Sequence, residues 1–191
     1  MKLEKLNDLY KQIATLTQGE YITGSGNVDA KILLVGEAPG AKEIELKEPF
    51  VGQAGKNLNE FLEILQIKRE DLFITNVVKI RPHKTNEKTG RKINRPPTQE
   101  EVRLFSNILK EEINIISPKI IVTLGNTPLK SVMANNKLTI GAVHGQILEK
   151  DDLLIFPLYH PASIIYNQNL KETYLDDLNK LKKIINIDVF L

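Results

Sequence analysis

Short apolar runs alternate along the chain with longer segments whose apolar residues recur at helical spacing. Four runs bounded by turn residues are typical of buried strands, at 31–35, 72–78, 119–124 and 152–158, and β structure is also expected over 138–150. The helical pattern covers about 1–18, 56–66, 98–117 and 170–187, with a short helix from 127. This alternation predicts the α/β class with a mostly parallel sheet.

The composition fits one compact domain over 1–191, with the first helix packed on it. The chain has 191 residues, of which 41% are hydrophobic, and this is enough for a sizeable core. Its formal net charge of +2 says nothing by itself about nucleic acid. It contains no cysteine, so disulfides and thiolate-bound metal sites are excluded, and an intracellular, cytoplasmic protein is expected. No apolar run is long enough to span a membrane.

A long loop rich in glycine and proline follows the first strand. Over 36–55 it reads G-E-A-P-G-A-K-E-I-E-L-K-E-P-F-V-G-Q-A-G, and it leaves the carboxyl end of a buried strand, where open α/β sheets bind ligands. Glu37 lies on its first turn, and Phe50 is placed where a flat ligand could stack. A purely structural loop is the alternative, but the length and the fixed backbone positions favour a functional one.

Polar residues follow the other strands at the same edge of the sheet. Asn76 lies near the end of the second run, Asn126 follows the third, and His160 follows the last. With Glu37 they are expected to meet in one cleft. Asn76 could instead make a local turn, and His160 could be a structural histidine before a proline. The helix start near Thr127 could hold a phosphate.

The segment 79–97 is strongly basic and follows the second strand. Against one acidic residue, Glu87, it carries Lys79, Arg81, His83, Lys84, Lys88, Arg91, Lys92 and Arg95. A basic run is usually solvated surface. This one flanks the expected cleft, so it favours contact with a polyanion.

Taken in order, the motifs resemble the uracil-DNA glycosylase superfamily. They are G-E-A-P-G with P-F-V-G-Q-A-G downstream, T-N-V-V-K-x-R-P, P-K-I-I-V-T-L-G and H-P-A-S, and they span 31–177. The resemblance is closest to the family 4 type. It implies a three-layer α/β/α sandwich with a four-stranded parallel sheet and a uracil pocket at its carboxyl edge.

The resemblance also implies roles for individual residues. Glu37 and His160 are the expected catalytic residues. Phe50 takes the place of the aromatic that stacks on uracil, and Asn76 that of the amide that reads the base. Glu43 occupies a further acidic position. The pocket is expected to include Gly36, Ala38, Pro39 and Gly40, with DNA contacts from Arg81, Lys84, Arg91, Lys92, Arg95, Asn126 and Ser163.

One departure from the family is the lack of the four cysteines that usually bind a 4Fe–4S cluster. Ile80 stands at one ligand position and Phe105 at another, so the cluster cannot form by the usual ligation. We expect Ile80, Phe105 and the leucines of the first helix to hold this region by packing. The chemistry is expected to need no metal and no other cofactor.

The expected function is hydrolysis of the N-glycosidic bond of uracil flipped out of DNA, as in base-excision repair. His160 would donate to uracil O2 as charge develops, and Glu37 would orient or deprotonate the water. The alternatives are a non-catalytic binder of uracil-containing or damaged DNA and a glycosylase for another deaminated base such as hypoxanthine. An unrelated nucleotide-binding protein is disfavoured, because the first loop lacks G-x-G-x-x-G. The expected partner is DNA containing uracil, with no membrane contact, and the protein is expected to be a monomer.

Overall fold

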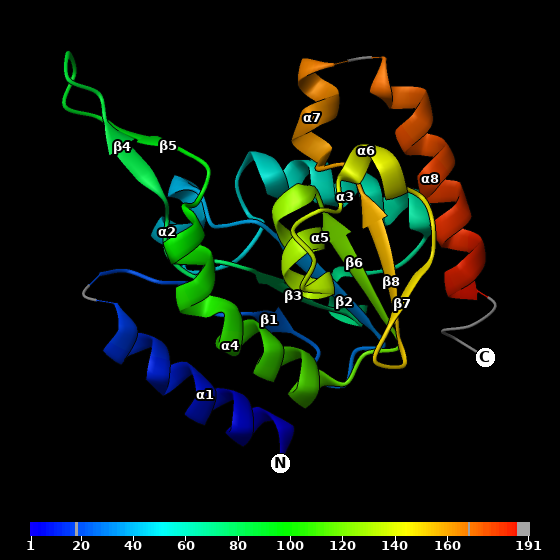
Figure 1. The fold of residues 1–191 in the computed structure, drawn as a ribbon, viewed down its shortest axis with the longest axis horizontal. Helices are drawn as coiled ribbons and strands as arrows, with labels where there is room; N and C mark the ends of the chain where they lie inside the picture. Colours follow the sequence, from blue (N-terminus) through cyan, green and yellow to red (C-terminus); the bar gives the residue numbers. More distant parts are fainter. Residues whose placement is uncertain (18, 168, 187–191) are drawn as a thin grey trace.

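A six-stranded mixed sheet forms the centre of the molecule (Figure 1), which a computed structural model describes over residues 1–17, 19–167 and 169–186. Four strands run parallel, in the order β3 (Leu72–Asn76), β2 (Ile32–Gly36), β6 (Ile120–Leu124) and β8 (Leu153–Leu158). These are the four strands expected from the apolar runs. The expected count of four was too low, because β1 (Ser25–Gly26) and β7 (Leu148–Lys150) add antiparallel edges.

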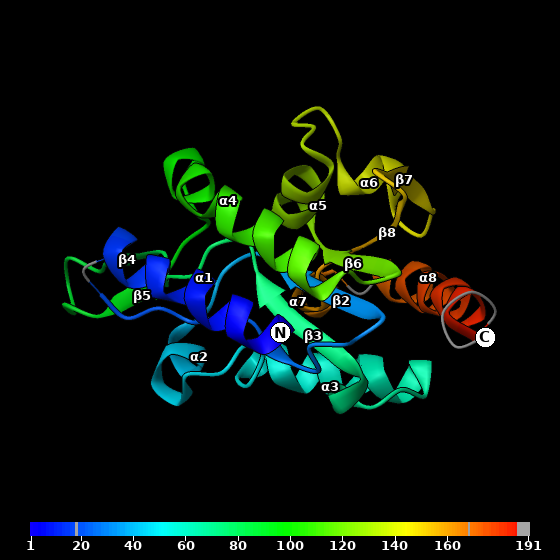
Figure 2. The ribbon, with the colours of Figure 1, turned by 90° about the horizontal axis from the view of Figure 1, so that it is seen from below.

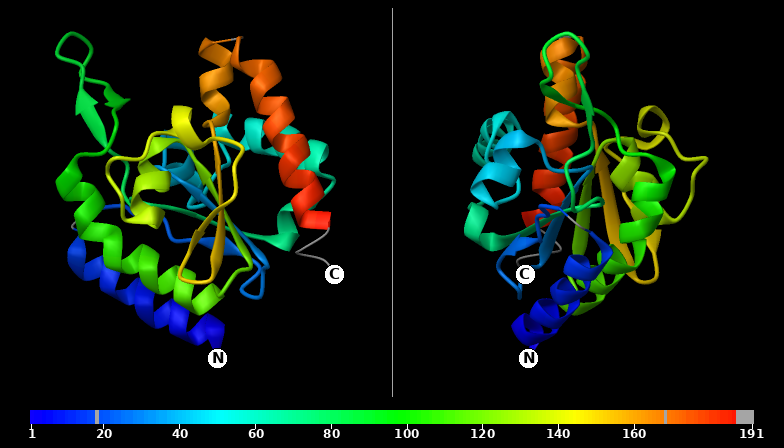
Figure 3. Two further views of the ribbon diagram at one scale, coloured as in Figure 1. Left: turned by 45° about the vertical axis from the view of Figure 1, so that its right-hand side comes forward. Right: turned by 90° about the vertical axis from the view of Figure 1, so that its left-hand side faces the viewer.

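Helices cover both faces of the sheet and give the three layers that the sequence implied (Figure 3). Successive strand residues point to opposite faces, so Ile32 and Leu34 enter one apolar core and Leu33 and Val35 the other. The first core is covered by α3 (Gln53–Leu65), α7 (Pro161–Tyr166) and α8 (Leu170–Ile184). The second is covered by α1 (Lys2–Leu16), α4 (Gln99–Ile116) and α5 (Asn126–Met133).

The amino-terminal helix α1 lies along α4 (Figure 2). Its buried residues Leu6, Leu9 and Ile13 join Phe105 of α4 in one apolar cluster, and Ile80 packs against that cluster. The expectation that these side chains hold the region by packing is therefore confirmed. The α4 helix starts with the capping box that the sequence predicts, in which the Thr98 and Glu101 side chains bond each other's backbone N–H groups.

Three segments differ from the prediction in local structure. The loop 36–55 contains helix α2 (Ala41–Leu46), and α3 already begins at Gln53. The segment 138–150 holds helix α6 (Ile140–Val143) before its strand, because Asn126 accepts the N–H of Ile140 and fixes that turn. The last helix is described to Ile184, and its expected end at 187 lies outside the described residues.

The basic segment 79–97 is a hairpin rather than a loop. Strands β4 (His83–Thr85) and β5 (Lys92–Asn94) pair antiparallel and project on the side toward which the parallel strands point (Figure 1). Lys79 was counted with the surface charges, but its side chain is fully buried in an ion pair with Glu112. Among the described residues, no helix is long and apolar enough to cross a membrane.

Candidate active site

A cavity of about 390 Å³ opens at the carboxyl ends of β2, β3 and β8. This is the edge at which open α/β sheets bind ligands. The cavity is lined by nearly all of the residues expected in the pocket and by one hairpin arginine: Glu37, Ala38, Pro39, Gly40, Glu43, Phe50, Asn76, Arg95 and His160. The structure therefore brings together the candidate acid, amide, aromatic ring and imidazole.

Gly36 lies where the amide and the aromatic ring approach the end of β2. It is in register with Asn76 on the neighbouring strand. A Cβ atom at Gly36 would overlap Asn76 Oδ1 and would lie 2.5 Å from Phe50 Cζ. Only glycine leaves room for both side chains here.

Phe50 is held in an unusual backbone conformation, with φ of 55°, which is costly for a bulky residue. The guanidinium of Arg69, in the short helix η1 (Arg69–Asp71), donates to the carbonyl oxygens of Phe50 at 3.1 Å and Pro49 at 2.5 Å. A Cβ atom at Gly55 would overlap the same Phe50 carbonyl oxygen. Arg69 therefore stabilises this backbone conformation, and glycine at position 55 leaves room for it, while Phe50 lines the cavity.

Glu43, the further acidic residue of the first motif, fastens the two ends of the loop. Its carboxylate is buried and accepts the N–H of Gly40 at 3.1 Å and that of Gly52 at 3.0 Å. Because both oxygens are engaged, Glu43 shapes the cavity wall.

Glu37 is oriented by Thr127, which the sequence did not predict as a site residue. Thr127, at the start of α5, donates its hydroxyl to Glu37 Oε2 at 2.5 Å. Its neighbour Asn126 was expected to contact DNA. Instead, its Oδ1 accepts a hydrogen bond from the N–H of Ile140, and the residue does not line the cavity. The helix start near Thr127 therefore meets a carboxylate of the protein itself, where a phosphate had been considered.

His160 caps α7 and also faces the cavity. Its Nδ1 accepts the N–H of Ala162 at 3.1 Å, so the ring proton resides on Nε2. Burial lowers the pKa of His160, although the negative charge of Glu37 acts in the opposite direction. The site therefore holds a neutral imidazole with an N–H to donate. Ser163, a candidate DNA contact, donates its hydroxyl to the His160 carbonyl at 2.6 Å and does not line the cavity.

Asn76 is only 5% exposed. Nevertheless, its side-chain amide has no hydrogen-bond partner within residues 1–17, 19–167 and 169–186. A buried amide normally finds a partner in the protein. One left open beside a cavity is suited to a ligand with complementary groups.

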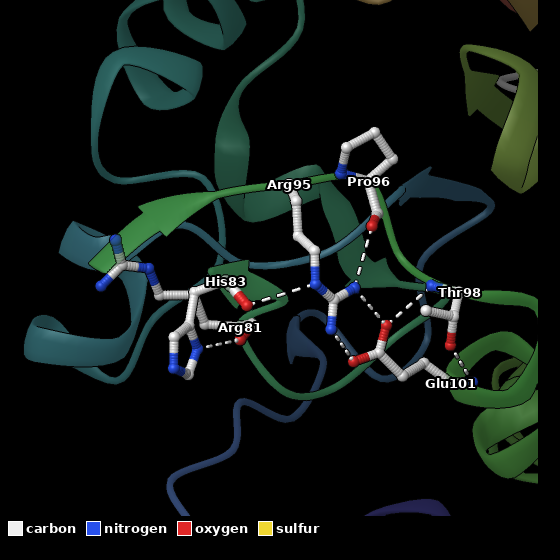
Figure 4. Close-up of polar contacts among 6 residues, drawn as sticks. All are labelled: Arg81, His83, Arg95, Pro96, Thr98 and Glu101. Carbon is white, nitrogen blue, oxygen red and sulfur yellow. Dashed lines mark hydrogen bonds and ion pairs between the residues drawn. The ribbon is translucent and has the colours of Figure 1, made fainter. Parts of the chain in front are cut away.

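Two arginines brace the base of the hairpin. Arg95 makes a two-fold ion pair with Glu101, at 2.8 and 2.7 Å, and also donates to the His83 carbonyl oxygen (Figure 4). Arg81 donates to Asn94 Oδ1 and to the Lys92 carbonyl. In the described part of the chain, the exposed hairpin cations without an ion pair are Lys84, Lys88, Arg91 and Lys92.

The residues at the expected cluster positions do not fit a 4Fe–4S cluster. Phe105 is fully buried and Ile80 is half-buried, and neither side chain has a ligand atom. The chain has no cysteine, and the described residues contain no group of three or more side chains that could hold a metal ion.

Comparisons with known proteins agree with the geometry. The family model of the uracil DNA glycosylase superfamily matches residues 23–182. A Type-4 uracil-DNA glycosylase of Sulfurisphaera tokodaii is 39% identical, over 89% of this chain and 80% of that protein. The corresponding enzyme of Archaeoglobus fulgidus is 36% identical over 94% and 92%, and that of Thermotoga maritima is 36% identical over 89% and 85%.

Proposed function

Since the chain belongs to the uracil DNA glycosylase superfamily, we propose that it hydrolyses the N-glycosidic bond of uracil flipped out of DNA. The observation that carries this proposal is the meeting of Glu37, Asn76 and His160 in one cavity at the carboxyl edge of the sheet. The substrate is DNA containing uracil. That the protein works as a cytoplasmic monomer stays a prediction.

Recognition of the base falls to Asn76 and Phe50. The Asn76 carbonyl oxygen can accept the uracil N3–H, and its N–H can donate to O4. Cytosine presents the reverse order of donor and acceptor, so it would leave groups unpaired in a buried site. Stacking on Phe50 offsets part of the cost of unstacking the base and contributes about 1–3 kcal/mol.

Cleavage of the glycosidic bond leaves an anionic base and a cationic sugar. His160, with its proton on Nε2, donates to uracil O2 as negative charge develops there. Glu37 has Oε2 bound by Thr127 and offers its other oxygen to the attacking water. Its negative charge also favours the cationic sugar, as in glycoside hydrolysis.

The hairpin supplies positive charge beside this site. Lys84, Lys88, Arg91 and Lys92 are exposed on β4, β5 and their turn, and such cations bind the phosphates of DNA without reading sequence. The proposed DNA path therefore runs over the cavity mouth and along the hairpin.

The test is single-turnover cleavage of labelled oligonucleotides that carry uracil, hypoxanthine, thymine or cytosine. We expect cleavage at uracil alone. Glu37→Gln and His160→Ala should each slow the reaction by about 10²–10³ and leave binding largely intact, because both groups act on charge of the transition state. Binding of uracil-DNA without cleavage would instead support the non-catalytic binder, and cleavage at hypoxanthine would widen the substrate class.

A further inference from the structure

A fully buried ion pair lies behind the end of β3. The Lys79 and Glu112 side chains are both 0% exposed, and Lys79 Nζ lies 2.6 Å from Glu112 Oε2. The proposed chemistry uses neither residue. Because removal from water opposes the attraction between two charges, a buried pair is weak evidence of a purely stabilising role.

The ammonium group of Lys79 contacts the last two residues of β3. Besides Glu112 it donates to Thr75 Oγ1 at 2.7 Å and to the carbonyl oxygen of Asn76 at 2.8 Å. These three bonds use all of its protons. Burial lowers the pKa of Lys79, and the carboxylate of Glu112 acts against this.

The backbone around Asn76 is therefore held from two directions. Toward β2, Val77 and Val78 donate their N–H groups to the carbonyls of Gly36 and Glu37 at 2.9 and 3.0 Å. On the opposite side the Asn76 carbonyl meets Lys79. The side-chain amide that faces the cavity is the part of this residue left without a partner in the described chain.

Glu112 connects this point to the amino-terminal helix. Its Oε1 accepts the Tyr10 hydroxyl of α1 at 2.8 Å, and both carboxylate oxygens accept the hydroxyl of Thr75. Burial, together with the neighbouring carboxylate, raises the pKa of Tyr10, so the hydroxyl stays protonated and donates. A continuous chain of hydrogen bonds thus runs from Tyr10 through Glu112 and Lys79 to Asn76.

We propose that Lys79 is a positioning residue for Asn76, and that Glu112 and Tyr10 hold Lys79, which makes α1 part of the apparatus that selects uracil. An amide that must meet two groups of a base needs its backbone fixed within a fraction of an ångström. Lys79 provides this by fixing the Asn76 carbonyl at the bend where β3 ends. The proposal rests on the proposed function, in which Asn76 reads the base.

The test uses the double variant Lys79→Met with Glu112→Leu, since replacing both charges leaves no uncompensated charge in the interior. We expect its melting temperature to stay near that of the parent and its single-turnover rate on uracil-DNA to fall by roughly ten- to hundredfold. A parent-like rate would overturn the proposal.

A milder variant keeps the test decisive if the double variant does not fold. Tyr10→Phe removes one hydroxyl and should slow cleavage by about two- to fivefold. The matched control is Tyr21→Phe, because Tyr21 packs against the same apolar cluster and should be neutral. Equal rates for the Tyr10 variant and the parent would overturn the proposal.

A double-mutant cycle separates positioning from general stabilisation. In an Asn76→Ala background the Lys79 and Glu112 replacements should slow the residual reaction by less than about threefold, because the network acts through Asn76. An undiminished effect in that background would overturn the proposal. If instead Asn76→Ala cleaves uracil at the parent rate, the proposed function of Asn76 fails, and this outcome is distinct from failure of the network alone.

Discussion

The hydroxyl of Thr127 donates a 2.5 Å hydrogen bond to Oε2 of Glu37, although 90 positions separate the two residues in the chain. One oxygen of the carboxylate is thereby fixed, and the direction of the other is set. Since a general base must be within reach of its water, the threonine controls the geometry of the proposed water-activating group.

Thr127→Val should slow uracil cleavage by about tenfold or more, because a hydrogen bond to a charged group is lost. Thr127→Ser keeps the hydroxyl and should recover most of the rate. The control is Thr123→Val on β6, where the buried hydroxyl has no partner in the described chain. Single-turnover kinetics measures all three, and a fast Thr127→Val enzyme would show that Glu37 needs no orientation.

His160 should titrate below the ordinary imidazole value of 6.5, because its pKa is lowered by burial. As pH falls through 6.5, the unfolded chain takes up a proton that the folded chain does not. The contribution of His160 to the free energy of unfolding therefore declines until the folded-state pKa is reached. The neutral imidazole persists below pH 6.5. NMR titration of the three histidine rings measures this, with His160→Ala to assign the signal. A midpoint above 6.5 would contradict the prediction.

Asn76→Ala should lose activity by at least about a hundredfold, because N3–H and O4 of uracil are left unpaired. Asn76→Asp should also lose uracil cleavage, since an ionised carboxylate repels O4. A weak gain on cytosine is expected at low pH, where a protonated carboxyl can donate to cytosine N3. The control is Asn107→Asp on the exposed face of α4. Cleavage of matched uracil and cytosine oligonucleotides provides the measurement. If Asn76→Asp cleaves uracil as fast as the parent, the Asn76 amide does not recognise the base.

Removing hairpin cations should weaken DNA binding and flatten its dependence on salt. For Arg91→Ala with Lys92→Ala, the slope of log affinity against log salt should fall by up to about two, one for each phosphate contact. Arg95 is not a suitable target, because it braces the hairpin through Glu101. The control is Lys5→Ala with Lys110→Ala, on α1 and α4, which removes the same amount of positive charge away from the hairpin. An identical slope for both pairs would mean that the hairpin is ordinary solvated surface.

Purified protein should be colourless and contain no stoichiometric iron, because Ile80 and Phe105 offer no ligand atom. Iron analysis and the visible absorption spectrum of freshly prepared protein check this. A cluster present in stoichiometric amount would contradict the prediction.

The central sheet could be predicted because its strands are buried on both faces and so appear as continuous apolar runs. The edge strands were harder to predict, because Ser25–Gly26 is too short to leave a pattern and Leu148–Lys150 is only the last part of the β structure expected over 138–150. Lys79 was misjudged as surface. A signal did exist: Glu112 lies at helical spacing from Phe105, Leu109 and Ile116, on the buried stripe of α4.

The residues of the candidate site could be predicted where they end a strand, as with Asn76, or follow one, as with Glu37 and His160. The sequence indicated Asn126 as the site residue after β6, but Thr127 is the residue that contacts Glu37. Both follow β6 in sequence, but the direction of a side chain at a helix start depends on how that helix meets its neighbours. Here one side chain meets Ile140 and the other meets Glu37.

The cavity draws on the ends of β2, β3 and β8, and on a helix that follows β6. No short fragment of the chain contains these parts. Neighbouring parallel strands cannot pair until the long connections between them have closed, so such sheets form slowly compared with helices. When the protein refolds from denaturant, helical signal should therefore return before uracil release does. The time at which uracil release returns therefore measures when the last long-range contacts of the fold have formed.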